Sequence, residues 1–349
     1  MKGARDMKKM ILPALVLALA LLCGCGGSAP EPEPTPSPTP EPTATPEPTA
    51  AADMEITLSL NGTVYAGLYS GSLRRMLPDG DGSFEGVSAA LERFSWSGGW
   101  AAGEPSGTGT LTADGISVSV EGETAVGFYT GEGTDGVPDG TGTFTSSDSG
   151  GVPFTYDGSW SSGKIEGNGT LTWDAENRYV RRGTFSDGCF TPTWLEALEA
   201  IGTAEPRFTL TEERLSFMEQ YPALREADNH RNYAKSDYRK LYDKSLTLAK
   251  VFKNPELISE PKWMGISSLR ILRSWTVTLG EHSFTCLSGS DNAYTYPVRV
   301  IIPESIEGLR RGQRFHVYGI PLTMSEYTTV LGQTVPCLVL LAGDVYIAK

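Results

Sequence analysis

The fold is decided by a register that is clearest at Tyr156-Asp157-Gly158-Ser159-Trp160-Ser161-Ser162-Gly163-Lys164-Ile165-Glu166-Gly167-Asn168-Gly169-Thr170-Leu171. An aromatic residue is followed by glycine at +2, by glycines at +11 and +13, and by a large apolar residue at +15. The same register begins at Tyr69, Trp96 and Tyr129, so that successive copies start 27, 33 and 27 residues apart. Self-similarity of this kind is typical of stacked repeats, in which each unit buries its apolar face against its neighbours.

One unit is predicted to be a β-hairpin. Positions 0 to +6 alternate as a strand, a turn rich in glycine, proline, aspartate and serine follows, and the second strand repeats with period two. Three copies carry glycine at +7, and Met76 replaces it in the first copy. Glycines on one strand face leave room for an aromatic ring to lie on the backbone, so we expect aromatic and glycine columns to interdigitate. The longer gap holds two further strand-like runs, 116–120 and 125–129.

This register resembles the MORN repeat, whose consensus reads roughly Y-x-G-x-W-x-x-G-x-x-x-G-x-G. The resemblance covers about residues 55–190 and includes a degraded fifth copy, Arg181-x-Gly183-x-Phe185-x-x-Gly188, which has the position of a terminal cap. It implies an elongated antiparallel meander over the predicted domain 53–190. It implies little about activity, because such repeats serve as scaffolds, membrane-proximal modules and enzyme appendages.

The N-terminus predicts a lipid anchor. Lys8 and Lys9 precede an apolar run, 11–22, that is too short to span a bilayer and has the length of a signal-peptide core. The run ends in a sequence that resembles a bacterial lipobox, with Cys25 as the lipidated residue after a signal peptide of residues 1–24. Cys23 fits less well, because Leu22 would then occupy the cleavage position; the alternative is an ordinary secretory signal with incidental cysteines. We therefore expect an extracytoplasmic protein held at the cell membrane by lipid, palmitate among the acyl chains.

Residues 25–52 are predicted to be a stalk. The segment 29–49 alternates proline, glutamate and threonine and contains nine prolines. Such a composition favours extended polyproline II and cannot bury a core. At about 3.1 Å per residue the reach of segment 29–49 is on the order of 60 Å.

The charge is concentrated in the repeats. Residues 53–190 contain 7 Lys/Arg against 19 Asp/Glu, a net charge of −12, whereas residues 191–349 contain 18 of each. An acidic repeat domain disfavours nucleic acid and anionic lipid headgroups as partners. A cationic partner remains compatible with this charge, and so does a merely solubilising surface.

Residues 191–261 are predicted to be a helical connector. Thr191 and Pro192 are typical of an N-cap and first helical position, with Gly202 at the far end. We expect this helix to cover the open end of the meander. A second helix is predicted to begin after Thr211, and a third to run over 236–251.

Residues 262–349 change to strand patterning. Turn signals separate five predicted strands: 266–279, 283–287, 298–302, 314–320 and 335–347. Together with the stretches 309–319 and 327–336, this pattern resembles the five-stranded OB-type barrel. The overall fold class expected is therefore mainly β: a meander of β-hairpin repeats, a short helical connector and a C-terminal OB-type barrel. Tyr294, Tyr296 and Tyr318 are candidates for a ligand-binding face on this barrel, although they could equally be ordinary half-buried strand residues.

Nothing in the sequence forms a convincing catalytic or metal site. The three histidines fall in different predicted elements, and no C-x-x-C spacing occurs. Cys286 and Cys337 are interpreted as buried free thiols, with a disulfide between them as the alternative. We expect no catalytic residue, no metal and no cofactor. The enzymatic alternative, an envelope glycan hydrolase, requires two carboxylates facing each other across a cleft.

These features favour a non-catalytic, surface-anchored lipoprotein that binds a cell-wall glycan or an envelope protein, and no nucleic acid. The alternatives are the hydrolase and a purely structural stalk or scaffold protein. The ligand-facing candidates in the repeats are aromatic: Trp96, Trp100, Tyr129, Tyr156, Trp160 and Trp173. The competing interpretation is that these rings form the internal stack of the repeats. The binding hypothesis requires at least two of them to lie exposed side by side.

Overall fold

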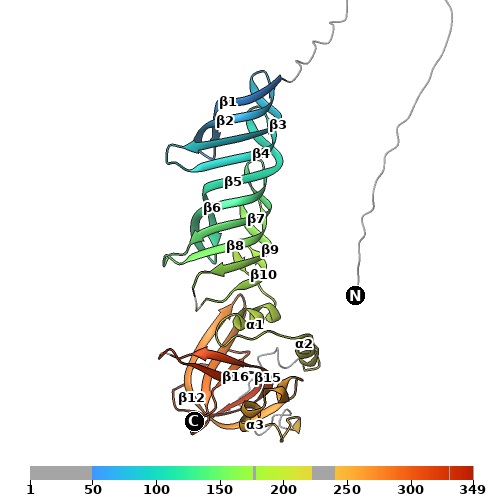
Figure 1. Cartoon of the computed structure of the whole chain (residues 1–349), viewed down its shortest axis with the longest axis vertical. Helices are drawn as coiled ribbons and strands as arrows, with labels where there is room; N and C mark the ends of the chain where they lie inside the picture. Colours follow the sequence, from blue (N-terminus) through green and yellow to red (C-terminus); the bar gives the residue numbers. More distant parts are fainter. Residues whose placement is uncertain (1–48, 176–177, 222–239, 330, 349) are drawn as a thin grey trace, which may run out of the picture. The chain divides into compact units, whose positions relative to one another are not determined.

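A computed structural model describes residues 49–175, 178–221, 240–329 and 331–348 (Figure 1). The described residues form one compact unit. The predicted signal peptide, Cys25 and nearly all of the predicted stalk lie outside the described residues. Among the helices of the described part, none has the length and apolar character needed to cross a membrane.

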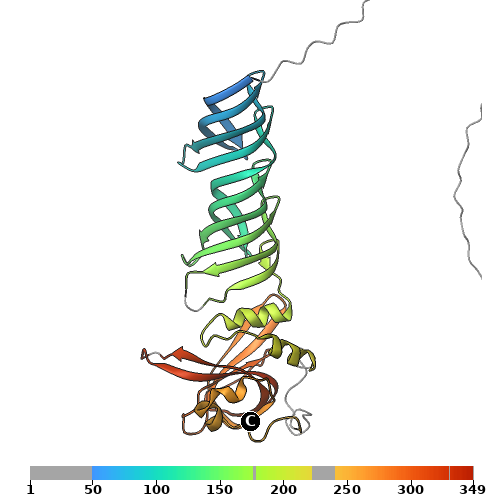
Figure 2. The ribbon, with the colours of Figure 1, turned by 45° about the vertical axis from the view of Figure 1, so that its right-hand side comes forward.

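The repeats form an eleven-stranded antiparallel meander, in which every strand pairs with its neighbours in sequence (Figure 2). The meander expected from the repeat register is therefore confirmed. Its strands are β1 (Thr49–Leu60), β2 (Thr63–Arg74), β3 (Leu77–Ser88), β4 (Arg93–Ala101), β5 (Glu104–Val120), β6 (Glu123–Thr134), β7 (Val137–Ser147), β8 (Pro153–Ser161), β9 (Lys164–Trp173), β10 (Arg181–Ser186) and β11 (Cys189–Phe190).

Each leading aromatic ring lies against glycine backbone of its own hairpin. Gly158 of β8 pairs directly with Gly169 of β9. A Cβ atom added at Gly169 would lie 2.3 Å from the Tyr156 Oη. The hydroxyl of Tyr156 donates to the carbonyl oxygen of Ser159 at 3.0 Å. The ring therefore lies on the backbone of the repeat glycines, which we call the glycine floor. Its hydroxyl group forms a hydrogen bond with the backbone three residues further along the strand.

Adjacent repeats are joined by a second ring, at position +4. Trp160 meets Tyr129 of the preceding copy edge-on, with ring centroids 5.0 Å apart. The pairs Trp100–Tyr69 and Phe185–Tyr156 repeat this geometry at 5.1 and 5.2 Å. Edge-to-face contacts of this kind add about 0.5–1.5 kcal/mol each to the area that they bury.

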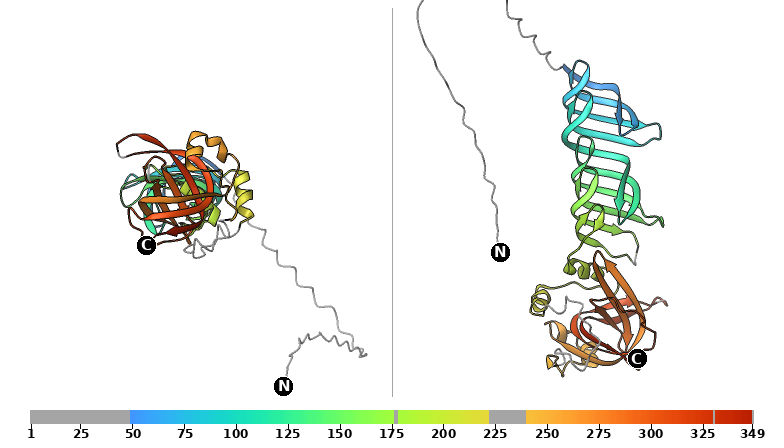
Figure 3. Two further views of the ribbon diagram at one scale, coloured as in Figure 1. Left: turned by 90° about the horizontal axis from the view of Figure 1, so that it is seen from below. Right: turned by 180° about the vertical axis from the view of Figure 1, so that it is seen from behind.

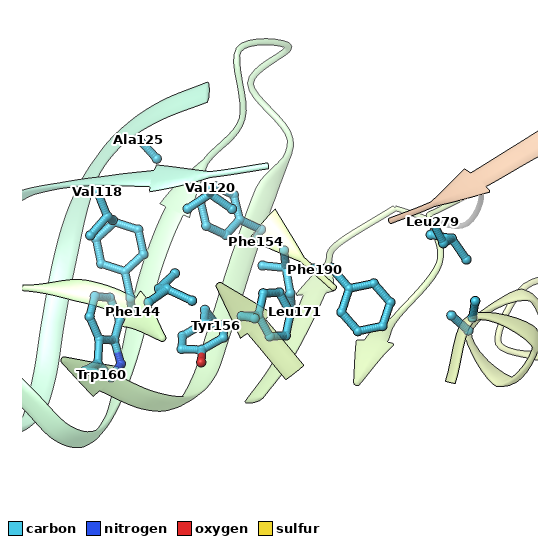
Figure 4. Packing of buried hydrophobic residues seen from close by; sticks show 14 of the residues in the cluster. Val118, Val120, Ala125, Phe144, Phe154, Tyr156, Trp160, Leu171, Phe190 and Leu279 are labelled. Carbon is cyan, nitrogen blue, oxygen red and sulfur yellow. The ribbon is translucent and has the colours of Figure 1, made fainter. Parts of the chain in front are cut away.

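The third copy breaks this series of rings. Its +4 position is Gly133, where an added Cβ atom would lie 3.0 Å from the ring of Trp96. No ring can occupy this place, and the interruption coincides with the longer 33-residue spacing. The additional residues lengthen β5 and β6, which bury Val118, Val120 and Ala125; Figure 4 shows Val120 beside the ring of Phe154.

The hairpin turns are also linked from one copy to the next. The backbone N–H groups of Gly103, Gly163 and Gly188, all at position +7, donate at 2.7–3.0 Å to carbonyl oxygens just after the turn of the preceding copy, those of Pro78, Pro138 and Ile165. Gly163 has φ +81°, a conformation that non-glycine residues adopt only at a cost. The +7 glycines therefore connect successive turns along one side of the sheet.

The connector contains α1 (Trp194–Gly202), α2 (Glu212–Glu219), α3 (Leu248–Lys253) and the 3₁₀ turn η4 (Pro255–Ile258). The predicted cap of the first helix is wrong by two residues. Thr193, not Thr191, is the N-cap, because Glu196 at N3 completes a capping box with it. The predicted cap Thr211 of the second helix is confirmed.

The third predicted helix, 236–251, is largely wrong. Residues 236–239 lie outside the described part, and helix is found only over Leu248–Lys253. The Asp243 carboxylate accepts a hydrogen bond from the backbone N–H of Ser245 at 2.8 Å. This side chain to backbone bond stabilises a turn where the helix was expected.

Helix α1 packs against β10 at the end of the meander, as expected from its position. It also contacts the C-terminal barrel. The Trp194 and Phe284 rings lie 6.1 Å apart, and the Nε2 of His282 lies 3.2 Å from the carbonyl oxygen of Pro192.

The C-terminal strands close into a five-stranded barrel, the orange-to-red ribbons of Figure 3. They are β12 (Met264–Leu279), β13 (His282–Ser290), β14 (Val298–Ile302), β15 (Arg314–Thr328) and β16 (Thr334–Ile347), in the spatial order β12-β13-β14-β16-β15. The β14–β16 pair is parallel and the other pairs are antiparallel. One buried cluster, including Leu287, Val300 and Leu340, fills the barrel. The outward side chains that alternate with these residues belong to a different cluster, which also contains residues of α1.

Candidate functional site

Five of the six aromatic candidates in the repeats are buried. Trp96, Tyr129 and Tyr156 are 0 % exposed, Trp100 is 3 % exposed and Trp160 is 4 % exposed. Their assignment as ligand-facing residues is therefore wrong, and the competing interpretation, an internal stack, describes them. The physical reason differs between the two ring positions. The leading rings Trp96, Tyr129 and Tyr156 lie on the glycine floor of their own hairpins, whereas Trp100 and Trp160 are buried against Tyr69 and Tyr129 of the preceding copies.

Trp173 differs from the other five. It lies half-buried at the end of β9 and lines a cavity of about 240 Å³. Its ring centroid is 6.3 Å from that of Phe154, the residue with which it pairs across β8 and β9. The cavity is otherwise lined mainly by polar residues from the β5–β6 hairpin, the β7–β8 loop and the segment before β10: Glu121, Glu123, Thr124, Ser147, Asp148, Ser149, Arg178 and Arg181.

Two arginines lie over the Trp173 ring. The Cζ of Arg181 is 4.9 Å from the ring centroid, and the Cζ of Arg178 is 5.6 Å from it. Each guanidinium is also paired with a carboxylate of the cavity. Arg178 donates to Asp148 at 2.7 Å, and Arg181 forms an ion pair with Glu121.

Both carboxylates are fixed from a second side. Asp148 Oδ1 accepts the backbone N–H groups of Gly150 and Val152 at 2.9 and 3.0 Å. Glu121 Oε1 accepts the N–H of Phe190 at 3.0 Å. Because each acid holds both a backbone segment and a guanidinium, the polar lining is preorganised.

The arrangement can bind a small polar group. A half-buried indole supplies an apolar wall, and guanidinium, carboxylate and hydroxyl groups surround it, the combination that orients a polar ligand in a concave site. Glu123 is an exposed carboxylate of the lining and makes no hydrogen bond or ion pair with the described residues. The cavity therefore offers one acidic group beyond its internal ion pairs.

The three barrel tyrosines do not form a common face. Tyr318 is 4 % exposed and packs on Tyr242, with ring centroids 5.1 Å apart. Tyr296 packs on Phe252, with centroids also 5.1 Å apart. Tyr294 alone is exposed, at 63 %. The predicted ligand face of these three residues is therefore wrong, because two of them cover apolar partners from the connector.

Sequence reasoning identified Trp173 but missed the residues around it. Glu121, Glu123, Arg178 and Arg181 were not among the predicted site residues. The signal was present in the long gap between the second and third copies. Additional residues in a regular repeat array indicate an inserted structural element. Here they extend the β5–β6 hairpin, which brings Glu121 next to Arg181 at the start of β10.

The cysteines are free thiols in the described part of the chain. Cys286 and Cys337 are buried, and Cys189 is exposed. Cys286 lies on β13 and Cys337 on β16, and β14 separates these strands. A disulfide requires Cα atoms within about 7 Å, so the alternative pairing is not formed. No group of three or more potential metal-ligating residues occurs within the described ranges.

Comparison with known families identifies MORN repeats at residues 96–116, 129–151 and 156–178. These matches coincide with three of the four copies seen in the sequence, and the first copy at Tyr69 has the same ring geometry. No match was found among curated proteins.

Proposed function

We propose that this protein is a non-catalytic binding module of the bacterial cell envelope, anchored by lipid at Cys25, and that it binds a cell-wall glycan at the Trp173 cavity. The observation that carries the proposal is the half-buried Trp173 ring in a 240 Å³ cavity with a preorganised polar lining. A sugar ring combines an apolar face with hydroxyl groups, and this site supplies a partner for each. MORN repeats support the coarser part of the proposal, a repeat-containing interaction module.

The repeat sheet favours a glycan or a protein over nucleic acid. Its net charge of −12 over residues 53–190 repels phosphate backbones. Apart from Trp173, the candidate aromatic rings of the repeats are buried and cannot stack on bases. A ligand must therefore use the cavity or the polar surface.

Binding is tested with the full chain, purified in non-ionic detergent, and with purified sacculi and soluble glycan fragments as ligands. We expect Trp173→Ala and Glu123→Gln to weaken binding. Tyr294→Ala, which removes an equally aromatic but distant and exposed ring, should bind like the wild type. Glu123 is exposed and glutamine has nearly the same shape, so Glu123→Gln should leave the fold intact. Its effect on binding can therefore be interpreted even if Trp173→Ala lowers stability. Equal binding by all four proteins, or none by the wild type, would refute the cavity as a glycan site.

Anchoring is tested by metabolic labelling with an alkyne fatty acid. We expect label on the wild type and on Cys23→Ser, and none on Cys25→Ser. Label that survives Cys25→Ser would place the lipid on another residue, and absence of label on the wild type would refute the lipid anchor.

A hydrolase is the second candidate, because Glu121, Glu123 and Asp148 line one cavity from two different hairpins. Two of these acids already bind arginines, which leaves Glu123 as the group available for proton transfer. Release of reducing ends from sacculi by the wild type but not by Glu123→Gln would favour this candidate over simple binding.

A further inference from the structure

The outer face of the barrel carries two arginines around one indole. Trp275 lies on β12, and the Cζ of Arg299 on β14 is 4.3 Å from its ring centroid. The Cζ of Arg273, two residues before Trp275 on β12, is 5.4 Å from the same centroid. Like charges so close repel each other, and the indole offsets only part of that repulsion.

Neither arginine has a counter-ion in the described part of the chain. The ion pairs there involve other residues. The Nε–H of Arg299 is buried and donates to no partner among the described residues. Arginine stays protonated in proteins, so this is a half-buried cation with unused hydrogen-bond donors.

The titratable groups near Arg299 cannot supply the missing charge at neutral pH. They are Cys286, Cys337, Tyr179, Tyr327 and the like-charged Arg273. Burial raises the pKa of Cys286 to about 12 and that of Cys337 to about 11. Burial also raises the pKa of Tyr179 and that of Tyr327. These thiols and phenols are therefore neutral at pH 7, and the site keeps two positive charges.

We propose that Arg273 and Arg299, held against Trp275 on the outer face of the barrel, bind an oxyanion, the phosphate or carboxylate group of a ligand. A planar guanidinium donates two parallel hydrogen bonds to such a group, and the indole fixes its plane. The site uses none of the residues of the Trp173 cavity and stands independently of the glycan proposal.

The test measures anion binding by the full chain in non-ionic detergent at constant ionic strength and constant chloride. Inorganic phosphate and acetate are titrated separately, by calorimetry and by the rise in melting temperature that binding to the folded state produces. We expect saturable binding of at least one of the two anions. The anion bound more tightly identifies whether the ligand carries phosphate or carboxylate.

Three variants decide the assignment. Arg299→Gln and Arg273→Gln should each raise the dissociation constant about tenfold or more, because a charge-assisted bidentate contact is lost. Arg311→Gln removes the same charge from an exposed turn and should leave binding unchanged. Without added anion, Arg299→Gln should melt no lower than the wild type, since it removes an uncompensated cation. Absence of saturable binding by the wild type, or equal loss in Arg311→Gln, would overturn the proposal. Arg273 is exposed, so its variant tests the site even if Arg299→Gln does not fold.

Discussion

Substituting Gly169 by alanine tests whether the glycine floor holds the repeat together. The new Cβ would lie 2.3 Å from the Oη of Tyr156 and 2.5 Å from its Cε2 and Cζ. The ring is 0 % exposed and cannot move without disturbing Trp160 and Phe185, whose centroids lie 5.6 and 5.2 Å away. The substitution therefore forces a packed aromatic cluster to shift.

The expected cost is about 2 kcal/mol. Overpacking of a core costs about 1–3 kcal/mol, and displacement of the ring loses the hydrogen bond to Ser159, worth about 1 kcal/mol. Replacing a strand glycine by alanine returns about 0.5–1 kcal/mol of backbone entropy. Gly163→Ala is the matched control, because its Cβ meets nothing within 4 Å. It should lower the free energy of unfolding by about 1–2 kcal/mol, solely because alanine disfavours the left-handed backbone conformation at this position.

The free energy of unfolding is measured in urea. Because repeat arrays need not unfold in one step, amide hydrogen exchange in β8 and β9 reports the local opening separately. Gly169→Ala should lose protection in these strands and in β10, where Phe185 contacts the Tyr156 ring. The Gly163→Ala variant should retain it. In a Tyr156→Phe background the clash should be relieved only in part, because Cε2 and Cζ remain. A Gly169→Ala protein with wild-type protection would refute the glycine-floor explanation of the register.

Other outcomes follow from the same structure. Thr193→Ala should destabilise the protein by about 1 kcal/mol, because it removes the hydrogen bonds that the Thr193 hydroxyl forms with the backbone N–H and the carboxylate of Glu196. Thr191→Ala should cost less, and thermal unfolding compares the two variants. Burial raises the pKa of Tyr156 to about 12, above the value near 10 of an unfolded tyrosine. The stability that depends on its protonation should therefore be intact below pH 10 and be lost as the pH rises through about 12, which absorbance of phenolate at 295 nm can follow together with circular dichroism. In the native protein a thiol reagent should label Cys189 rapidly and the two buried thiols only after unfolding, as peptide mass spectrometry would show; rapid labelling of all three would contradict the described burial.

The fold was predictable because its determinants are periodic. The rings and glycines of Tyr156–Leu171 recur in register, and the barrel strands alternate between turn signals, so local sequence and tertiary structure agree. The functional residues were harder to predict from the sequence, because an aromatic residue at position 0 can be buried or exposed and its residue type does not distinguish the two. Glycines at +2 and +13 could have decided this, because a ring resting on them is covered by its own sheet. The Trp173 cavity unites three segments through ion pairs between residues as distant as Glu121 and Arg181. The longer spacing between the second and third copies indicates an inserted hairpin, but not which residues that hairpin contacts.

The turn that replaced the third predicted helix shows a different limit. The apolar stripe over 236–251 fits helical spacing, but Asp243 forms a local hydrogen bond with the backbone of Ser245 that helix formation would forfeit. Short-range polar competition of this kind outweighs periodicity when the helix is short.

The glycine at position 133 has a consequence for cooperativity. In a one-dimensional array, the size of the unit that unfolds together is set by the coupling between neighbours. Ring contacts couple the copies on either side of the gap, Tyr69 with Trp100 and Tyr129 with Trp160, but none passes through Gly133. The series of ring contacts is thus interrupted here, and the copies on either side are joined by the backbone ladder between β5 and β6 and by the inserted hairpin. We expect amide hydrogen exchange to show the copies before Gly133 opening separately from the block that carries the Trp173 cavity, and a single opening event across the whole sheet would contradict this expectation.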